Sequence, residues 1–218
     1  MQILIVSLFA TMFSGHASLP DKSNQYLFPP NEVVTGLYCI GLDSVKDYLH
    51  LPGPIEFDGS SYRLAWTAHP SKNYYKQEYI PKRNEVEHYH KMVFLDVVVD
   101  TGNLRDVVRA KLLQLELRKR KDSVVNYKLL QKPDSTEYVL DFVLSDGEPL
   151  LDVVEWDVYR YKAFVDSSGH KGYVVFANSL RAYGGEIDGF FGTLGATRKR
   201  VIALMAKYGM PVIDVRDE

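Results

Sequence analysis

One stretch of the sequence, Trp66–Tyr79, is dense in side chains that can recognise another molecule. Tyr and Trp offer rigid contact area that is partly apolar and partly polar, and this composition is typical of recognition surfaces. In an extended chain, alternate residues share a face, so three of these side chains project together. The same pattern fits cross-strand aromatic pairs that only stabilise a sheet, and that alternative stays open. The candidate binding residues are Trp66, His69, Tyr75, Gln77 and Tyr79.

Paired carboxyl groups offer a second kind of chemistry. Glu155 and Asp157 share one face of an expected strand, and Glu78 lies in the aromatic stretch. Two carboxyl groups can serve as acid and base in the hydrolysis of a glycan or another polymer of the cell envelope. Solvated carboxylates on a sheet surface would have the same spacing. The sequence alone therefore leaves the paired carboxylates as an alternative to a binding surface.

Histidine supplies the one candidate for a metal site. If the segment around His88 and His90 is a strand, the two imidazoles project on one face, whereas in a helix they diverge. A zinc site needs at least a third protein ligand, which His69 could supply only through the fold. No P-loop, GxSxG, HExxH or CxxC motif is present. We expect no metal or organic cofactor and lean towards a protein that is not an enzyme.

The glycines of GFFGTLG, which are Gly189, Gly192 and Gly195, resemble a phosphate-binding loop only superficially. The acidic residues Glu186 and Asp188 stand at its entry and would repel a phosphate. The spacing predicts instead that a helix approaches the sheet closely here, or that the helix begins only near Thr193.

The elements that would position these residues follow from apolar periodicity and turn residues. Helices are expected from Thr101, as N-cap, to Arg118–Lys121 and over Glu186–Lys207, and one or two helical turns within Asn84–Lys91. Short turns rich in Pro, Gly, Asp and Ser join the later strands, which indicates an antiparallel meander. The expected strands are Tyr62–Ala68, Tyr74–Ile80, Met92–Asp100, Val124–Gln131, Glu137–Ser145, Leu151–Val165 and Tyr173–Tyr183.

This order predicts an α+β fold in which an antiparallel meander sheet of six to seven strands is packed between helices, an α/β/α sandwich. The order of elements resembles the Mog1/PsbP-like α/β/α sandwich. The segments Trp66–Pro81 and Asp141–Glu148 also resemble bacterial exported proteins of unknown function. The resemblance covers residues 60–207, and it implies a protein that binds partners or assists assembly.

The N-terminal sequence predicts export. Ile3–Phe13 is an apolar, uncharged run of signal-peptide length, shorter than the roughly 20 residues that span a bilayer. Small residues at Gly15 and Ala17 fit cleavage after Ala17. The single cysteine, Cys39, lies in an apolar context that favours a structural thiol. The expected divisions are a signal peptide over 1–17, a leader rich in Pro and Gly over 18–61, and one α+β domain over 62–218.

Composition narrows the possible partners. The chain has 218 residues, with 26 Lys and Arg against 28 Asp and Glu. This balance gives no basis for nucleic-acid binding, which needs a cationic surface. No later segment is long and apolar enough to span a membrane. We expect a periplasmic or secreted, non-catalytic binding or assembly-accessory protein whose partner is another envelope or secreted protein. The alternatives are the carboxylate hydrolase and a histidine-based metal carrier.

Overall fold

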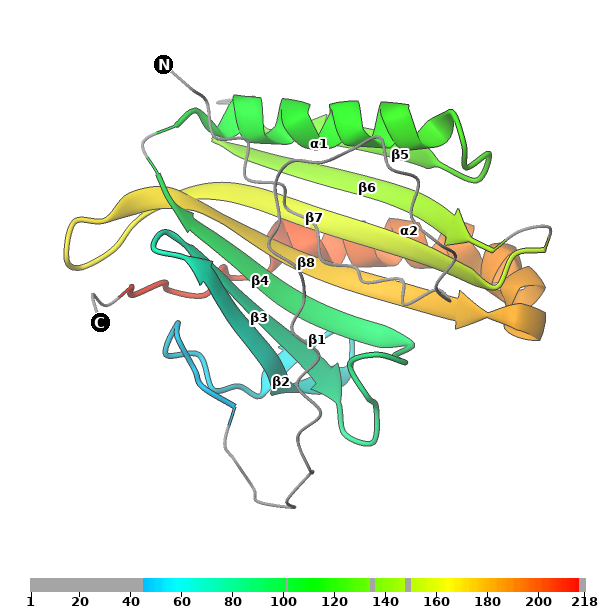
Figure 1. Ribbon diagram of the computed structural model, residues 1–218, viewed down its shortest axis with the longest axis horizontal. Helices are drawn as coiled ribbons and strands as arrows, with labels where there is room; N and C mark the ends of the chain where they lie inside the picture. Colours follow the sequence, from blue (N-terminus) through cyan, green and yellow to red (C-terminus); the bar gives the residue numbers. More distant parts are fainter. Residues whose placement is uncertain (1–44, 101, 134–135, 148–149, 216–218) are drawn as a thin grey trace, which may run out of the picture. The chain divides into compact units, whose positions relative to one another are not determined.

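The computed structural model describes residues 45–100, 102–133, 136–147 and 150–215 (Figure 1). The expected signal peptide, Cys39 and the proposed cap Thr101 lie outside the described residues. The strands are β1 (Ile55–Phe57), β2 (Ser60–Ser71), β3 (Tyr74–Pro81), β4 (Lys91–Val99), β5 (Asn126–Gln131), β6 (Glu137–Asp146), β7 (Val153–Val165) and β8 (Lys171–Tyr183). The helices are α1 (Leu104–Lys119), the short 3-10 helix η1 (Gly184–Glu186) and α2 (Ile187–Lys207).

The strands form one curled antiparallel sheet in the order β1-β2-β3-β4-β8-β7-β6-β5 (Figure 1). Neighbours in sequence pair within β1–β4 and within β5–β8, as the short connections predict. The two runs are joined by pairing of β4 with β8, with Leu95 opposite Phe176. This central pairing brings together segments separated by the whole of α1 and β5–β7.

The predicted six- to seven-stranded sheet between helices was wrong. The sheet has eight strands, and both helices lie over the half formed by β5–β8, where α1 contacts β5 and β7 and α2 contacts β6, β7 and β8. Residues Val108 and Leu115 of α1 pack on one face, and Val201 and Met205 of α2 pack on the other. The helices follow β4 and β8 and turn back over the second run of strands, so they cover the half formed by β1–β4 much less. There α1 packs with Leu104 and Val107 against Tyr74 and Val98.

The described chain before residue 62 belongs to the core rather than to a leader. Leu49, Ile55 and Phe57 are buried with the apolar side chains of β3, β4 and β8. The Leu49 backbone N–H donates to Gln77 Oε1 at 2.9 Å, and the Tyr79 hydroxyl donates to the Leu51 carbonyl at 2.7 Å. The segment around Ser44–Leu49, for which a short helix was expected, forms a turn in its described part. The packed fold therefore begins before residue 49.

Two local expectations about helices need correction. Helix α2 begins at Ile187, and its three glycines lie on the exposed side, where a Cβ added at any of them would meet no atom within 4 Å. They neither bring the helix closer to the sheet nor delay its start. At α1 the N-cap is Asn103, whose side chain accepts from the Arg105 backbone N–H at 2.9 Å. The helix ends at Lys119, within the basic run where its end was predicted.

Candidate functional site

Seven ionisable side chains converge on the face of the sheet that carries α1, and we call them the ionic cluster. Four are carboxyls and three are cations, and they come from β3, β4, β7, β8 and α1. Six of them are at most 7% exposed, which is rare for charged residues and calls for internal partners. The members are Lys76, Glu78, Asp96, Lys111, Glu155, Asp157 and Arg181.

The β3–β4 part of the cluster is organised by Lys76. Its Nζ lies 3.2 Å from Glu78 Oε1 and 3.7 Å from Asp96 Oδ1, and it sits 4.1 Å from the centre of the Phe94 ring. The Tyr74 hydroxyl donates to Asp96 Oδ1 at 3.0 Å. Burial raises the pKa of both Glu78 and Asp96, although the ammonium of Lys76 opposes this rise. Burial alone would lower the pKa of Lys76, but the two carboxylates outweigh it and raise that pKa.

The β7–β8 part is organised by Glu155, which pairs with Arg181 on the neighbouring strand. Arg181 Nε donates to Glu155 Oε2 at 2.6 Å, and the Tyr89 hydroxyl donates to the same oxygen at 2.7 Å. Arg181 Nη2 donates in turn to the Tyr89 hydroxyl oxygen at 2.8 Å. The register places Glu155 opposite Arg181, so the strand pairing itself sets this ion pair.

Asp157 lies beside Glu155 on the same strand face, and both are 0% exposed. Ser179 Oγ donates to Asp157 Oδ1, while Asp157 Oδ2 and Glu155 Oε1 accept no bond from any donor among the described residues. Burial raises the pKa of Asp157 well above its usual value, and the nearby charge of Glu155 raises it further. A proton on Asp157 provides the donor that the pair lacks and allows the two carboxyls to hydrogen-bond to each other.

Lys111 reaches the cluster from α1. Its Nζ lies 4.7 Å from the centre of the Phe142 ring and 5.1 Å from that of Tyr159. Burial lowers the pKa of the Lys111 ammonium, against the opposing effect of Asp157. With one proton on Asp157, three negative charges face three positive ones, and the cluster is neutral. Neutrality is what a buried cluster requires, because an unpaired charge in the interior is very costly.

The candidate binding residues of the first hairpin do not form an exposed surface. Alternation is as predicted, but Tyr75, Gln77 and Tyr79 are buried under the segment that contains Leu49. Trp66 and His69 are half-buried, and His69 stacks on Tyr75 with ring centres 4.1 Å apart. The hairpin therefore contributes three of its five candidate residues to the core. The opposite face of the same strand contributes Lys76 and Glu78 to the ionic cluster.

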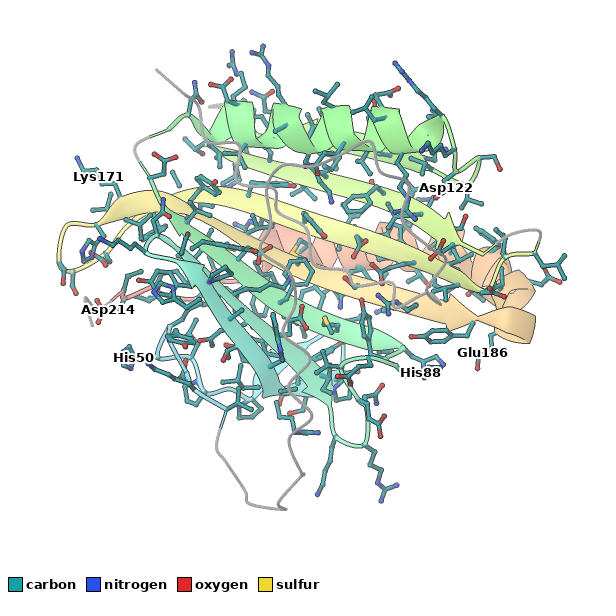
Figure 2. All side chains as sticks on the ribbon, in the orientation of Figure 1. His50, His88, Asp122, Lys171, Glu186 and Asp214 are labelled. Carbon is teal, nitrogen blue, oxygen red and sulfur yellow. The ribbon has the colours of Figure 1, made fainter. Side chains whose placement is uncertain are left out.

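The histidine pair lies at the surface, at one end of the sheet (Figure 2). His88 stacks on Tyr183 with ring centres 4.0 Å apart, and His90 Nε2 lies 3.0 Å from Glu186 Oε2. The segment that carries them has turns and bends but no helical turn. Within the described ranges, no group of three or more His, Cys, Asp or Glu side chains could hold a metal ion.

A groove of about 470 Å³ lies at the other end of β7, between the strand and the chain after α2. Phe164, Val165, Met210 and Val212 contribute apolar walls, and Asp214 at its end accepts a hydrogen bond from Ser167 at 2.8 Å. None of the ionic cluster lines this groove. It is separate from the charged site.

Reasoning from sequence found Glu78, Glu155 and Asp157 but missed the other members of the cluster. Asp96 was the most visible signal, since it is a lone charge in the middle of the apolar strand MVFLDVVVD. Lys111 and Arg181 stand in patterns that also fit a solvated helix face and an exposed strand position. Only the pairing of β8 with β7 and the placement of α1 bring them to the carboxyls.

Comparison with known proteins finds a matching family, for which no activity is described. The model of an uncharacterised protein family matches residues 49–210, most of the chain. The chain belongs to that family. The match begins at Leu49, which is the first buried residue of the described chain. No curated protein and no solved structure matches the chain. Across the described residues, neither helix has the length and apolar character needed to cross a membrane.

Proposed function

We propose that the protein is an exported binding protein of the cell envelope and that its ligand site is the ionic cluster. The observation that carries the proposal is the convergence of seven ionisable groups in one place on the sheet, six of them buried. Buried ion pairs are rarely the most stabilising solution for a protein core, since apolar residues of similar volume often do as well or better. A concentration of perturbed pKa values is typical of functional sites.

The charges of the cluster favour a small zwitterionic ligand. In the ligand-free protein, carboxyls and cations satisfy each other, as in the pairs Lys76–Glu78 and Arg181–Glu155. A ligand with a single charge would leave one member of such a pair buried without a counter-charge. A ligand that carries both an ammonium and a carboxylate can replace one internal pair and keep the site neutral. Amino acids and short peptides of the envelope have this chemistry.

Calorimetric titration tests the proposal with defined probes: glycine, L-alanine and the dipeptide D-alanyl-D-alanine, with N-acetylglucosamine and acetate as neutral and anionic controls. We expect heat of binding from at least one zwitterion and none from the controls. Glu155→Gln should abolish that binding, because Glu155 pairs with Arg181 in the cluster. Asp141→Asn is the control, since Asp141 is also buried but lies on the opposite face, next to Trp156. Absence of zwitterion binding, or binding that survives Glu155→Gln, would contradict the proposal.

A hydrolase is the second candidate, because Asp157 lies beside Glu155 and burial raises the pKa of Asp157. Two carboxyls that share one proton are the arrangement that aspartic proteases use. Glycosidases instead keep their carboxyls about 5–9.5 Å apart, so that the sugar lies between them. The hydrogen-bonded pair thus favours an amide substrate over a glycan. Release of fragments from envelope peptides by the wild type, but not by Glu155→Gln, would place this candidate first.

Export is the part of the proposal that rests on the sequence alone. The apolar run Ile3–Phe13 and the small residues up to Ala17 support it. The intact mass of the protein from its native host should correspond to a chain that begins at Ser18. A chain that still begins at Met1 would contradict export.

We expect a macromolecular partner, if the protein has one, to contact Trp66 and His69. These are the two candidate residues of the hairpin that are partly exposed.

A further inference from the structure

The ionic cluster is bordered by one irregular segment, residues 82–90, which joins β3 to β4. The segment has turns and bends only, and its charged side chains face solvent. A single side chain of the segment is fully buried: Tyr89, which is 2% exposed. Arg83, at its start, has a φ of +75°, a backbone conformation that is unfavourable for a residue other than glycine. Tyr89 is thus the main anchor of the segment, and Val86, which is half-buried and packs against the same apolar cluster, is a weaker second one.

Tyr89 occupies a position within the charged site rather than beside it. Its hydroxyl donates to Glu155 at 2.7 Å and accepts from Arg181 at 2.8 Å. The Arg181 guanidinium also lies 4.1 Å from the centre of the Tyr89 ring. Tyr89 therefore offers the cluster one donor for its carboxylate and one acceptor for its cation. A bound zwitterion would offer the same two functions, an ammonium to Glu155 and a carboxylate to Arg181.

The remaining attachments of the segment are few. The Tyr183 hydroxyl donates to the Tyr89 carbonyl at 3.0 Å, and the Arg181 backbone N–H donates to the His90 carbonyl at 3.0 Å. Outside the core, His88 stacks on Tyr183 and His90 contacts Glu186. The two histidine contacts are at the surface, where water competes with them, so they contribute little to holding the segment in place.

We propose that residues 82–90 form a lid over the ionic cluster and that Tyr89 is an internal substitute for the ligand. When the lid opens, Tyr89 withdraws, and Glu155 and Arg181 can bind a zwitterion in its place. This inference rests on the proposed function for the identity of the ligand, but the opening of the lid is a separate property. It explains how a site in which Glu155 and Asp157 are 0% exposed can be reached from solvent.

Thiol labelling tests the lid, in the full chain with Cys39→Ser as background. Ser179→Cys places a thiol on β8 next to Asp157, beneath the lid, and Ala177→Cys, on the same face, is a second reporter in case the first variant folds poorly. Ala182→Cys is the matched control, because Ala182 is a buried residue of the same strand on the opposite face. The rate of labelling by a small disulfide reagent is then measured for each of these cysteine variants, once with Tyr89 in place, once with Tyr89→Phe and once with Tyr89→Ala.

We expect Tyr89→Ala to speed labelling at residue 179 at least about tenfold, with no such change at residue 182, because two hydrogen bonds to charged groups are lost. Tyr89→Phe should give a smaller increase, since it keeps the ring on Arg181. Equal acceleration at residues 179 and 182, which indicates general destabilisation, would overturn the lid, and so would no acceleration at either. Lid opening without zwitterion binding would contradict the proposed function alone. Zwitterion binding without lid opening would contradict the lid alone.

Discussion

Asp157 controls the charge balance of the ionic cluster. It faces Glu155 on its own strand, Ser179 on β8 and Lys111 from α1, and of these only Lys111 brings a positive charge. The raised pKa of Asp157 means that the folded protein retains a proton which the unfolded chain releases near pH 4. A folded state that binds more protons than the unfolded state loses stability as pH rises.

The first prediction concerns Asp157→Asn. The amide keeps a donor towards Glu155 and cannot lose a proton, so the variant should gain stability relative to the wild type as pH rises above about 4. The difference in free energy of unfolding between variant and wild type should grow by up to about 1.4 kcal/mol per pH unit, until Asp157 ionises in the folded wild type. Urea unfolding at several pH values between 4 and 8 measures it. If variant and wild type keep the same difference in free energy of unfolding over that range, Asp157 is not protonated in the folded state.

At the scale of elements, glycine has opposite roles in β8 and in α2. A Cβ at Gly172 would overlap the carbonyl oxygen of Val98 on β4, so the strand pairing at this point leaves no room for a side chain. At Gly192 in α2 nothing lies within 4 Å. The close approach therefore belongs to the centre of the sheet and not to the glycine-rich start of the helix, where the sequence suggested it.

The second prediction compares alanine at these two glycines. Gly172→Ala should lower the free energy of unfolding by about 1–3 kcal/mol, since β4 and β8 must separate locally to admit the methyl group. Gly192→Ala should raise it by about 0.5–1 kcal/mol, because alanine is the better helix former. Thermal unfolding of both variants beside the wild type measures the two shifts. A Gly172→Ala variant as stable as the wild type would show that β4 and β8 are not so closely paired.

For the molecule as a whole, the packed fold described here includes the chain before β1. Leu49 is 0% exposed, and its neighbour Leu51 accepts the hydrogen bond of Tyr79. This segment covers the face of β3 that would otherwise expose Gln77 and two tyrosines. It lies on the half of the sheet that the helices cover least.

The third prediction concerns the segment that contains Leu49 and covers one face of β3. Leu49→Ala should cost about 2–4 kcal/mol of stability, as large-to-small changes in a core do. Leu113→Ala, on the outer side of α1 and 61% exposed, is the control and should change stability by no more than about 0.5 kcal/mol. Urea denaturation measures both. Similar small effects for the two leucines would mean that the segment before residue 52 only rests on the sheet.

Most of the local structure could be predicted from the amino-acid sequence. The strands β2–β4 and β5–β8 and both long helices lie close to the predicted ranges. Alternation of side chains, turn residues and helical periodicity act between residues near in sequence, so their signal can be read without the fold. Alternation also separated the two faces of β3 correctly, with Tyr75 on one face and Lys76 on the other.

Which face of each strand is covered, and by which segment, depends on long-range contacts. The pairing of β4 with β8 and the return of α1 over β5–β8 join residues far apart in sequence, and no local pattern encodes them. These long-range contacts bury the hairpin tyrosines that looked exposed and bring Arg181 and Lys111 to Glu155 and Asp157. A charged residue has the same local signature on a solvated face and in a buried pair, because the difference lies in partners that the fold supplies.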